Sequence, residues 1–406
     1  MSPRPAARCA AIGSSPTVAL SDLVRELRAR GADVLDVGGG DPDFDAPAHV
    51  LEATARSVLA GFTHYTPSRG VPALRAAVAE KLAADNGIKV DPDHEVLVTP
   101  SSKHALFAAL MAVLDPGDEV LLPTPSWVSY QAMARLAGAT PVPVPLTASD
   151  GFRITAGRLA TAVTARSRAL VLNTPNNPTG HVVDEREAEE IVAFAGRHDL
   201  VVIVDEIYEK IVFGGARHLS VASLPGAAER TITVNGLSKA YAMPGWRLGY
   251  AAGPAELVAA MLTVHQHTVA CAGSFAQQGA VAALTGPQDA VTAMTAEYAA
   301  RADAVVTALN ALPDITCGRV EGAFYAFPDI SATASPDCRE FARRLLAEES
   351  VAVTPGVAFG PGGQGHLRIS LTSSRPVLAE VVARIARVAQ RDRRHAGVIG
   401  GASPFR

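Results

Sequence analysis

The sequence predicts an α/β fold with a mostly parallel sheet, together with a second, smaller α+β domain. Short apolar runs of strand type alternate with longer helical patterns over most of the 406 residues. That alternation is typical of a parallel sheet covered by helices on both faces. The run Val201–Val204 is apolar throughout, as expected for a strand that is buried on both faces. A chain of this length has room for two or three domains.

Composition limits the class of protein. Apolar residues make up 48% of the chain, charged residues 19%, and the formal net charge is −4. This is a globular composition, and the acidic balance argues against a nucleic-acid partner because phosphate binding favours a basic surface. The longest apolar run, residues 105–114, is too short to cross a bilayer. For this reason we expect no membrane partner. Four cysteines lie far apart without a CxxC pair, so we expect a cytoplasmic protein.

The strand and helix candidates follow one another in order along the chain. The short runs predicted as strands are Val34–Val37, Val96–Val98, Glu119–Leu122, Ala169–Leu172, Val201–Val204, Thr231–Val234 and Leu248–Ala251. The predicted helices include Leu20–Arg30, Ala73–Ala84, Lys103–Leu114, Glu185–Arg197 and Ala290–Leu312. Beyond residue 290, a long helix leads to a short strand set and two more helices. The predicted strands of that set are Gly322–Phe327, Val351–Thr354 and His366–Leu371.

These patterns predict the domain organisation. We expect residues 1–45 to form an N-terminal arm and part of the small domain, with residues 1–16 extended. Residues 46–290 are expected to form the large domain and residues 291–390 the small C-terminal domain. The tail, residues 391–406, is basic and then rich in glycine, and we expect it to be mobile. The large domain would then be inserted between two parts of the small one.

Polar, turn-rich segments follow four of the predicted strands. They are Thr99–Lys103, Asn173–Gly180, Asp205–Tyr208 and Asn235–Lys239. Each segment alone has an ordinary explanation, such as a helix cap, a turn or a surface lysine. In open α/β sheets, however, ligands bind at the carboxyl ends of the strands. Four such segments in this order therefore predict one shared pocket.

At these segments the sequence resembles the class-I aminotransferases, enzymes of fold type I that depend on pyridoxal 5′-phosphate (PLP), and in particular bacterial aspartate aminotransferases. The likeness runs from about residue 17 to about residue 388 and implies a seven-stranded sheet in the large domain. The stretches that carry it are Gly39–Phe44, Tyr65–Pro67, Asn176–Gly180, Asp205–Tyr208, Ser238–Arg247, Gly322–Tyr325 and His366–Ser370. The stretch Ser238–Arg247 is the most specific of these.

The resemblance implies roles for the residues around the cofactor ring. Lys239 would bond to the PLP aldehyde through its amine and act as the catalytic residue, moving a proton during the reaction. Asp205 would pair with the protonated ring nitrogen. Asn177 and Tyr208 would donate hydrogen bonds to the ring hydroxyl oxygen. Trp127 would stack on the ring face, although a core aromatic is an alternative interpretation.

The same resemblance places the cofactor phosphate. Ser101 and Ser102 open a predicted helix, where free N–H groups favour an anion, and Arg247 would add a guanidinium. Relatives often carry a hydroxyl residue three positions before the lysine, where this chain has Gly236. One phosphate hydrogen bond is therefore expected to be missing or to come from Ser238.

Further residues implied by the resemblance concern the substrate and a second subunit. Arg368 would bind the substrate α-carboxylate, with Gly40 against the same group. Lys103 would bind the distal carboxylate of an acidic substrate, although a surface lysine is an equal alternative. Tyr65 resembles a tyrosine that reaches the phosphate of the neighbouring subunit, which implies a homodimer with shared sites.

Two other patterns are weak. Residues 360–365 match G-x-G-x-x-G, but a strand pattern follows where a dinucleotide site needs a helix. His265 and His267 lie near Cys271, yet no third ligand is placed by spacing, so we expect no metal site.

Three functions remain open. The first is an aminotransferase that moves an amino group from an L-amino acid, aspartate or glutamate favoured, to a 2-oxo acid such as 2-oxoglutarate. The second is a PLP enzyme of the same fold with other chemistry, as in a lyase, an oxidase or a synthase. The third is a non-catalytic regulator, which the presence of Lys239 disfavours.

Overall fold

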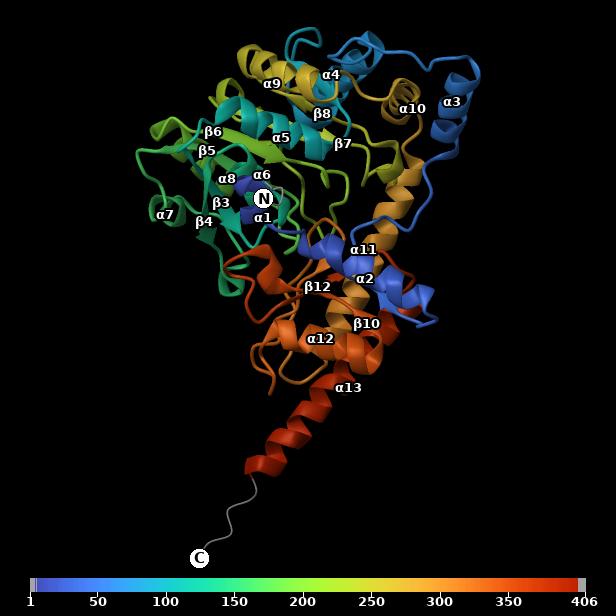
Figure 1. Cartoon of the computed structure of the whole chain (residues 1–406), viewed down its shortest axis with the longest axis vertical. Coiled ribbons are helices and arrows are strands. Elements are labelled where there is room, and N and C mark those ends of the chain that lie inside the picture. The colour runs from blue at the N-terminus through green and yellow to red at the C-terminus, as the bar shows by residue number, and fades with distance from the viewer. Residues whose placement is uncertain (1–3, 5, 401–406) are drawn as a thin grey trace, which may run out of the picture.

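The computed structural model describes residues 4 and 6–400, apart from the side chains of residues 11 and 394–400. Its centre is a seven-stranded sheet of order β2-β8-β7-β6-β5-β3-β4 (Figure 1). Only β8 runs antiparallel to its neighbours, so the predicted mostly parallel sheet is confirmed. The strands are β2 (Val96–Thr99), β3 (Glu119–Thr124), β4 (Thr140–Pro145), β5 (Ser167–Asn173), β6 (Val201–Asp205), β7 (Thr231–Gly236) and β8 (Gly249–Ala252).

Helices cover both faces of this sheet. One face packs against α5 (Ser102–Val113), α6 (Ser129–Leu136) and α9 (Ala255–Thr268). The other packs against α3 (Ala48–Leu59), α4 (Pro72–Asn86), α7 (Ala156–Ala160), α8 (Glu185–Arg197) and α10 (Ser274–Thr285). Short 3-10 turns lie at Ala148–Asp150, Val221–Ser223, Ala228–Arg230, Pro244–Trp246 and Gly356–Phe359.

Local signals set several helix ends. Helix α8 has the predicted bounds because the Asp184 side chain accepts a hydrogen bond from the backbone N–H of Glu187, and acidic residues in the first turn favour the helix dipole. Helix α4 begins at a proline, and it ends at Gly87, which has the left-handed conformation of a C-cap.

A smaller part of the fold lies beside the sheet and has its own core (Figure 1). In it, β1 (Leu35–Asp36) pairs in parallel with β10 (Val351–Ala352). A three-stranded antiparallel sheet contains β11 (Thr354–Pro355), β12 (Leu367–Ser370) and β9 (Tyr325–Ala326). The helices of this part are α2 (Pro16–Ala29), α11 (Asp289–Asn310), α12 (Cys338–Glu349) and α13 (Arg375–Gly400). Segments from the two ends of the chain therefore lie together.

Strand β4 was not among the predicted strands. Its sequence, TPVPVP, contains three prolines, which lack the N–H that a central strand donates. The strand lies at the edge of the sheet, where it pairs only with β3. Proline is tolerated at an edge, so the sheet reaches seven strands through this segment, whereas Val34–Val37 contributes β1 to the smaller part.

The two ends of the chain also differ from expectation. The segment predicted to be extended contains a short helix, α1 (Ala7–Ile12), whose alanines favour helix. At the other end, α13 continues beyond residue 390. The Asp392 side chain is buried there and pairs with Arg344, which fixes the start of the predicted tail. Residues 1–3, 5 and 401–406 of the predicted arm and tail lie outside the described residues.

In the described part of the chain, no helix has both the length and the apolar character needed to cross a membrane.

Candidate active site

A cavity of about 350 Å³ lies at the carboxyl ends of the sheet strands, where the smaller part of the fold meets them. This is the place where open α/β sheets bind ligands, and the volume suits a small molecule. Segments from distant parts of the chain meet around it. The residues predicted for the site that line the cavity are Gly40, Ser102, Trp127, Asn177, Asp205, Tyr208, Lys239 and Arg368.

Lys239 follows β7 and reaches across to the smaller part of the fold. Its Nζ donates a hydrogen bond to the backbone carbonyl of Gly40 at 2.5 Å. Burial lowers the pKa of Lys239 to about 8, against the opposing charge of Asp41. A substantial fraction of this amine is therefore neutral near pH 8, as a nucleophilic lysine requires.

Asp205 ends β6 and is buried at the floor of the cavity. The hydroxyl of Tyr130 donates to its Oδ2 at 2.7 Å, and the backbone N–H of Ile207 donates to its Oδ1 at 3.2 Å. Burial raises the pKa of Asp205 to about 6 although both hydrogen bonds lower it. The carboxylate is thus ionised at neutral pH and would be stabilised further by a cationic partner.

A chain of hydrogen bonds connects β5 to the small-domain strand β12. Asn173, the last residue of β5, donates through Nδ2 to the carbonyl of Asp205 at 2.9 Å, and its Oδ1 accepts from the N–H of Asn177 at 2.8 Å. The Oδ1 of Asn177 accepts from Nη1 of Arg368 at 3.1 Å. The orientation of Asn177 is thereby set, and its Nδ2 has no hydrogen-bond partner among the described residues.

Arg368 is a buried guanidinium whose charge an anion would stabilise. It is 3% exposed and lies over the rings of Tyr325 and Phe359, at 4.5 and 4.9 Å from their centroids. Its Nη2 donates to the carbonyls of Gly38 and Gly39, while its Nε has no hydrogen-bond partner among the residues that the structure describes. Within the described chain no carboxylate forms an ion pair with it. Because a buried unpaired charge is costly, a bound carboxylate would stabilise this site.

Gly40 leaves room for a tyrosine. A Cβ at this position would lie 2.3 Å from the hydroxyl oxygen of Tyr325. That hydroxyl is 3.0 Å from the hydroxyl of Tyr208, and both side chains are buried. Glycine at position 40 therefore leaves space for the Tyr208–Tyr325 pair beside the cavity. The structure thus gives a packing reason for this glycine, whereas the sequence predicted a contact with the substrate.

The N-terminus of α5 is the place where the sequence predicts an anion site. Ser101 caps the helix, with its Oγ accepting from the N–H of His104 at 3.3 Å. Strand β8 passes so close that a Cβ at Gly249 would lie 2.2 Å from the backbone nitrogen of Ser102. Arg247 is exposed, and its charge contributes to lowering the pKa of Lys239. Free N–H donors at the start of a helix favour an anion, and the pKa of Lys103 in the first turn of α5 is lowered by partial desolvation and by the charge of Arg247.

Gly236, the departure from the family pattern, has a packing reason. A Cβ there would lie 3.0 Å from the carbonyl oxygen of Leu248 and 3.2 Å from both Gly249 Cα and Ile207 Cδ1. A hydroxyl residue would crowd these atoms. Ser238 is buried nearby but does not line the cavity.

Five predicted residues lie outside the cavity lining: Ser101, Ser238 and Arg247, described above, and also Lys103 and Tyr65. Lys103 is exposed, with its Nζ 4.9 Å from the centre of the Trp127 ring, so it lies at the rim. Tyr65 is 91% exposed and points to solvent. The cavity within one chain therefore contains neither side chain.

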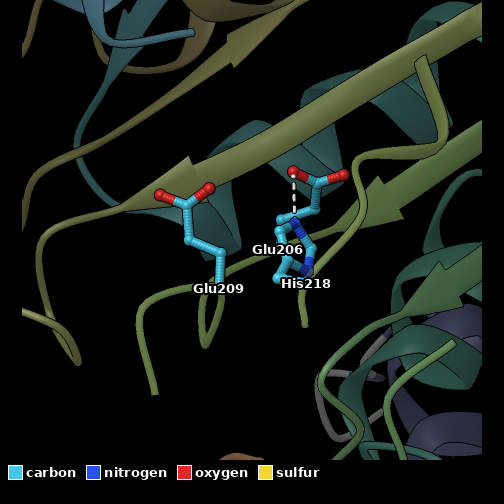
Figure 2. A group of neighbouring side chains, drawn as sticks. All are labelled: Glu206, Glu209 and His218. Atoms are coloured by element: carbon cyan, nitrogen blue, oxygen red, sulfur yellow. Dashed lines mark ion pairs between the residues drawn. The ribbon is translucent and has the colours of Figure 1, made fainter. Parts of the chain in front are cut away.

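A buried polar cluster supports the segment that carries Asp205 and Tyr208 (Figure 2). It contains Glu206, Glu209 and His218, whose possible ligand atoms lie within 4.8 Å of one another. Nε2 of His218 is 3.2 Å from Oε2 of Glu206, and this carboxylate raises the pKa of His218 although burial opposes it. Such spacing could hold a metal ion. However, the ammonium of Lys81 pairs with Glu209 and already neutralises it.

The cluster joins three elements. Asn86 in α4 donates to Oε2 of Glu209 at 2.7 Å and to Oγ of Ser220 at 2.6 Å. Ser220 in turn donates to Oε2 of Glu206 at 2.7 Å. These bonds connect α4 and the loop before Val221 to the residues that follow β6, so the cluster fixes the position of the Asp205–Tyr208 segment.

Sequence reasoning missed several residues that line the cavity, and three of them make hydrogen bonds to predicted site residues. Asn173 belongs to one of the polar segments that follow the strands, and Tyr325 belongs to a stretch that carries the family resemblance. The sequence therefore contained a signal for both. Tyr130 lies inside α6, where its sequence context is that of an ordinary core aromatic. Only the fold shows that its hydroxyl reaches Asp205.

Comparison with known proteins agrees with this geometry. The family model "Aminotransferase class I and II" matches residues 32–385. An aspartate aminotransferase of Musicola paradisiaca is 46% identical over 92% of this chain and 94% of its own length. The crystal structure of the aspartate aminotransferase from Rhizobium meliloti is 39% identical, with a TM-score of 0.91 over 96% of this chain and 100% of that one. An aromatic aminotransferase from Pyrococcus horikoshii is 41% identical, with a TM-score of 0.87 over 92% and 99%.

The fold and site thus define an aminotransferase. The chain belongs to the class I and II aminotransferase family. The family resemblance, the α/β fold and the enzyme class expected from the sequence are confirmed.

Proposed function

We propose that this aminotransferase uses PLP to move the amino group of an L-amino acid, with aspartate or glutamate favoured, to a 2-oxo acid such as 2-oxoglutarate. The carrying observation is that Arg368, which is buried and has no ion-pair partner in the described part of the chain, lines the same cavity as Lys239 and Asp205. Amino acids and 2-oxo acids share a carboxylate that matches this guanidinium. The aspartate aminotransferases among the relatives support the acidic substrate.

The residues present fit PLP. Asp205 would hold the protonated ring nitrogen, since it is a buried carboxylate with a raised pKa. Asn177 Nδ2, which has no partner among the described residues, could donate to the ring hydroxyl oxygen, and Tyr208 lines the same cavity. Ser101, Ser102, Ser238 and Arg247 would hold the phosphate at the start of α5, with Trp127 on the ring face.

PLP, when bound, supplies an electron-withdrawing ring that stabilises negative charge at the substrate Cα. Lys239 would hold the cofactor through Nζ and, once released, take and return the proton at that carbon. Arg368 would orient the substrate through its carboxylate, with Asn177 keeping the guanidinium in place. Because Arg368 and Tyr325 belong to the smaller part of the fold, substrate binding there would favour closure and exclude water.

Lys103, which lies at the cavity rim beside Trp127, is the candidate for distal-carboxylate recognition that the family resemblance implies. Half-reactions of the PLP-loaded enzyme with the twenty amino acids, read by loss of the absorbance of the lysine-bound cofactor, test this proposal. Aspartate and glutamate should react faster than alanine, and a selective slowing of aspartate in Lys103→Ala would assign the distal carboxylate to Lys103. Steady conversion of 2-oxoglutarate to glutamate would distinguish transamination from lyase, oxidase or synthase chemistry, which leave that acid unchanged.

We also propose a homodimer with shared active sites. Exposed apolar side chains gather on α3 and the segment after it, and α3 packs against α10 (Figure 1). They are Leu51, Val58 and Leu59 on α3 and Phe62 and Tyr65 after it, and Phe275 on α10 and Val269 after α9 are exposed as well. A group of exposed apolar side chains of this size favours an interface. Tyr65 projects from the same surface, so a second copy would receive its hydroxyl.

A further inference from the structure

Helix α2 forms one wall of the active-site cavity. Thr17, Ser21 and Arg25 are spaced four residues apart, so they lie along one face of this helix, and all three line the cavity with Val18. The adjacent face packs Leu20, Val24 and Leu27 against the smaller part of the fold. The helix is therefore held by its apolar face while its polar face is turned to the cavity.

The charges around the cavity are unequal. Among the described lining residues, Lys239, Arg368 and Arg25 are cationic, whereas Asp205 is the one carboxylate. Lys239 and Asp205 serve the cofactor in the proposed function, and Arg368 binds the α-carboxylate. Arg25 has no role in the proposed function, although it lines the same cavity.

The existing partner of Arg25 is easily replaced. In the described chain its ion pair is with Asp22, one turn back on α2, and the Arg25 side chain is 73% exposed. Exposed pairs of this kind contribute little stability because water screens them. A substrate carboxylate could take the place of Asp22 and be bound by the planar fork of the guanidinium. Lys103, by contrast, lies at the rim beside Trp127.

We propose that Arg25 determines specificity by binding the second carboxylate of a dicarboxylate substrate. The inference rests on the proposed function and deepens it, since it assigns the distal subsite to α2. A dicarboxylate would then connect Arg368 on β12 with Arg25 on α2, and both belong to the smaller part of the fold. Asp22 competes with the substrate for the same guanidinium.

Calorimetric binding of two non-reacting acids to the PLP-loaded enzyme tests the subsite without turnover. Succinate has the second carboxylate and butyrate lacks it. Arg25→Gln should weaken succinate about tenfold while butyrate changes less than about twofold. Asp22→Asn should strengthen succinate by about twofold because it removes the competitor.

Arg30 and Glu26 offer matched controls. They form an exposed pair on the same helix, with Arg30 71% exposed, and neither lines the cavity. Arg30→Gln and Glu26→Gln should leave both affinities unchanged. Equal losses for succinate and butyrate in Arg25→Gln, or the same loss in Arg30→Gln, would overturn the proposal.

Kinetics separates this inference from the function on which it rests. In wild-type enzyme kcat/KM for aspartate should exceed that for alanine, and Arg25→Gln should reduce the ratio about tenfold through KM. A wild type that uses alanine as well as aspartate contradicts the proposed substrate, while the succinate-to-butyrate ratio still decides the role of Arg25. A preference for aspartate that survives Arg25→Gln but not Lys103→Ala contradicts the inference alone.

Discussion

At the scale of single residues, burial sets the chemistry of the site. The pKa of Lys239 is lowered to about 8, and that of Asp205 is raised to about 6. Each shift moves the group towards its neutral form, as expected for desolvation. Between these two pKa values Asp205 is ionised while Lys239 is still mostly protonated, so the amine becomes the group that limits bond formation below pH 8.

The first prediction follows from the pKa of Lys239 being higher than that of Asp205. The rate at which cofactor-free protein bonds to added PLP should rise from pH 7 and level off above about pH 8, because only the neutral amine of Lys239 reacts. Borohydride reduction at each pH, followed by peptide mapping, measures the adduct. Asp41→Asn should move the midpoint to lower pH because Asp41 raises the lysine pKa. An adduct on another lysine, or a rate independent of pH, would contradict the assignment.

The second prediction concerns the crowding at Gly40. Gly40→Ala should reduce stability by about 1–3 kcal/mol, since its Cβ would lie 2.3 Å from the hydroxyl oxygen of buried Tyr325. Urea unfolding measures the loss. The double variant Gly40→Ala/Tyr325→Phe should recover part of it relative to the sum of the single changes. Strictly additive losses would show that the two groups do not meet.

At the scale of elements, the ion cluster behind β6 connects α4 to the loop that carries two site residues. The side chains of Lys81 and Glu209 are 6% and 7% exposed. Although burial opposes ionisation, the Lys81 ammonium lowers the pKa of Glu209. The charged pair therefore persists in the interior, and its integrity determines where Asp205 and Tyr208 lie.

The third prediction breaks this pair. Lys81→Met should destabilise the fold by about 3–5 kcal/mol, because it leaves a buried carboxylate without its cation. Lys210→Met is the control, since its pair with Asp85 is partly exposed and should cost about 1 kcal/mol or less. Glu209→Gln should restore part of the stability of Lys81→Met in urea unfolding. Equal losses of stability in the two lysine variants would show that the buried cluster contributes no more to stability than a partly exposed ion pair.

At the scale of the whole molecule, the site is assembled from both parts of the fold and, in the proposed dimer, from two chains. The strand ends contribute Asp205 and Lys239, while β12 contributes Arg368. The exposed Tyr65 lies on the apolar surface around α3. Relative movement of these bodies would therefore change the cavity directly.

The fourth prediction tests sharing between chains. Lys239→Ala and Tyr65→Ala homodimers should each have low activity. Mixed after reversible dissociation, they should regain about a quarter of wild-type activity, because half of the dimers then carry one intact site. Sedimentation at micromolar concentration should show the dimer throughout. An active monomer, or no recovery on mixing, would contradict shared sites.

The sequence alone was sufficient where the signal is local. The apolar run Val201–Val204 marks a strand that is buried on both faces, and Asp184 with its acidic first turn marks the start of α8. The polar segments after four strands predicted one pocket, because parallel strands direct their carboxyl ends to one edge. Most of the predicted site residues do line one cavity. Periodicity and capping act within a few residues, so they can be recognised without the fold.

The tertiary structure decided what depends on distant neighbours. The prolines of β4 are acceptable only because this strand lies at the sheet edge. Tyr130 is a partner of Asp205 only because the fold brings α6 near the end of β6, and a side chain at Gly236 would be crowded because Leu248 and Gly249 pass beside it. In the sequence Arg25 is an ordinary helical arginine, and only the position of α2 beside the cavity shows that it lines the site. Sequence patterns encode which face of an element is apolar, but the atoms that meet each polar group are chosen by the packing of the whole chain.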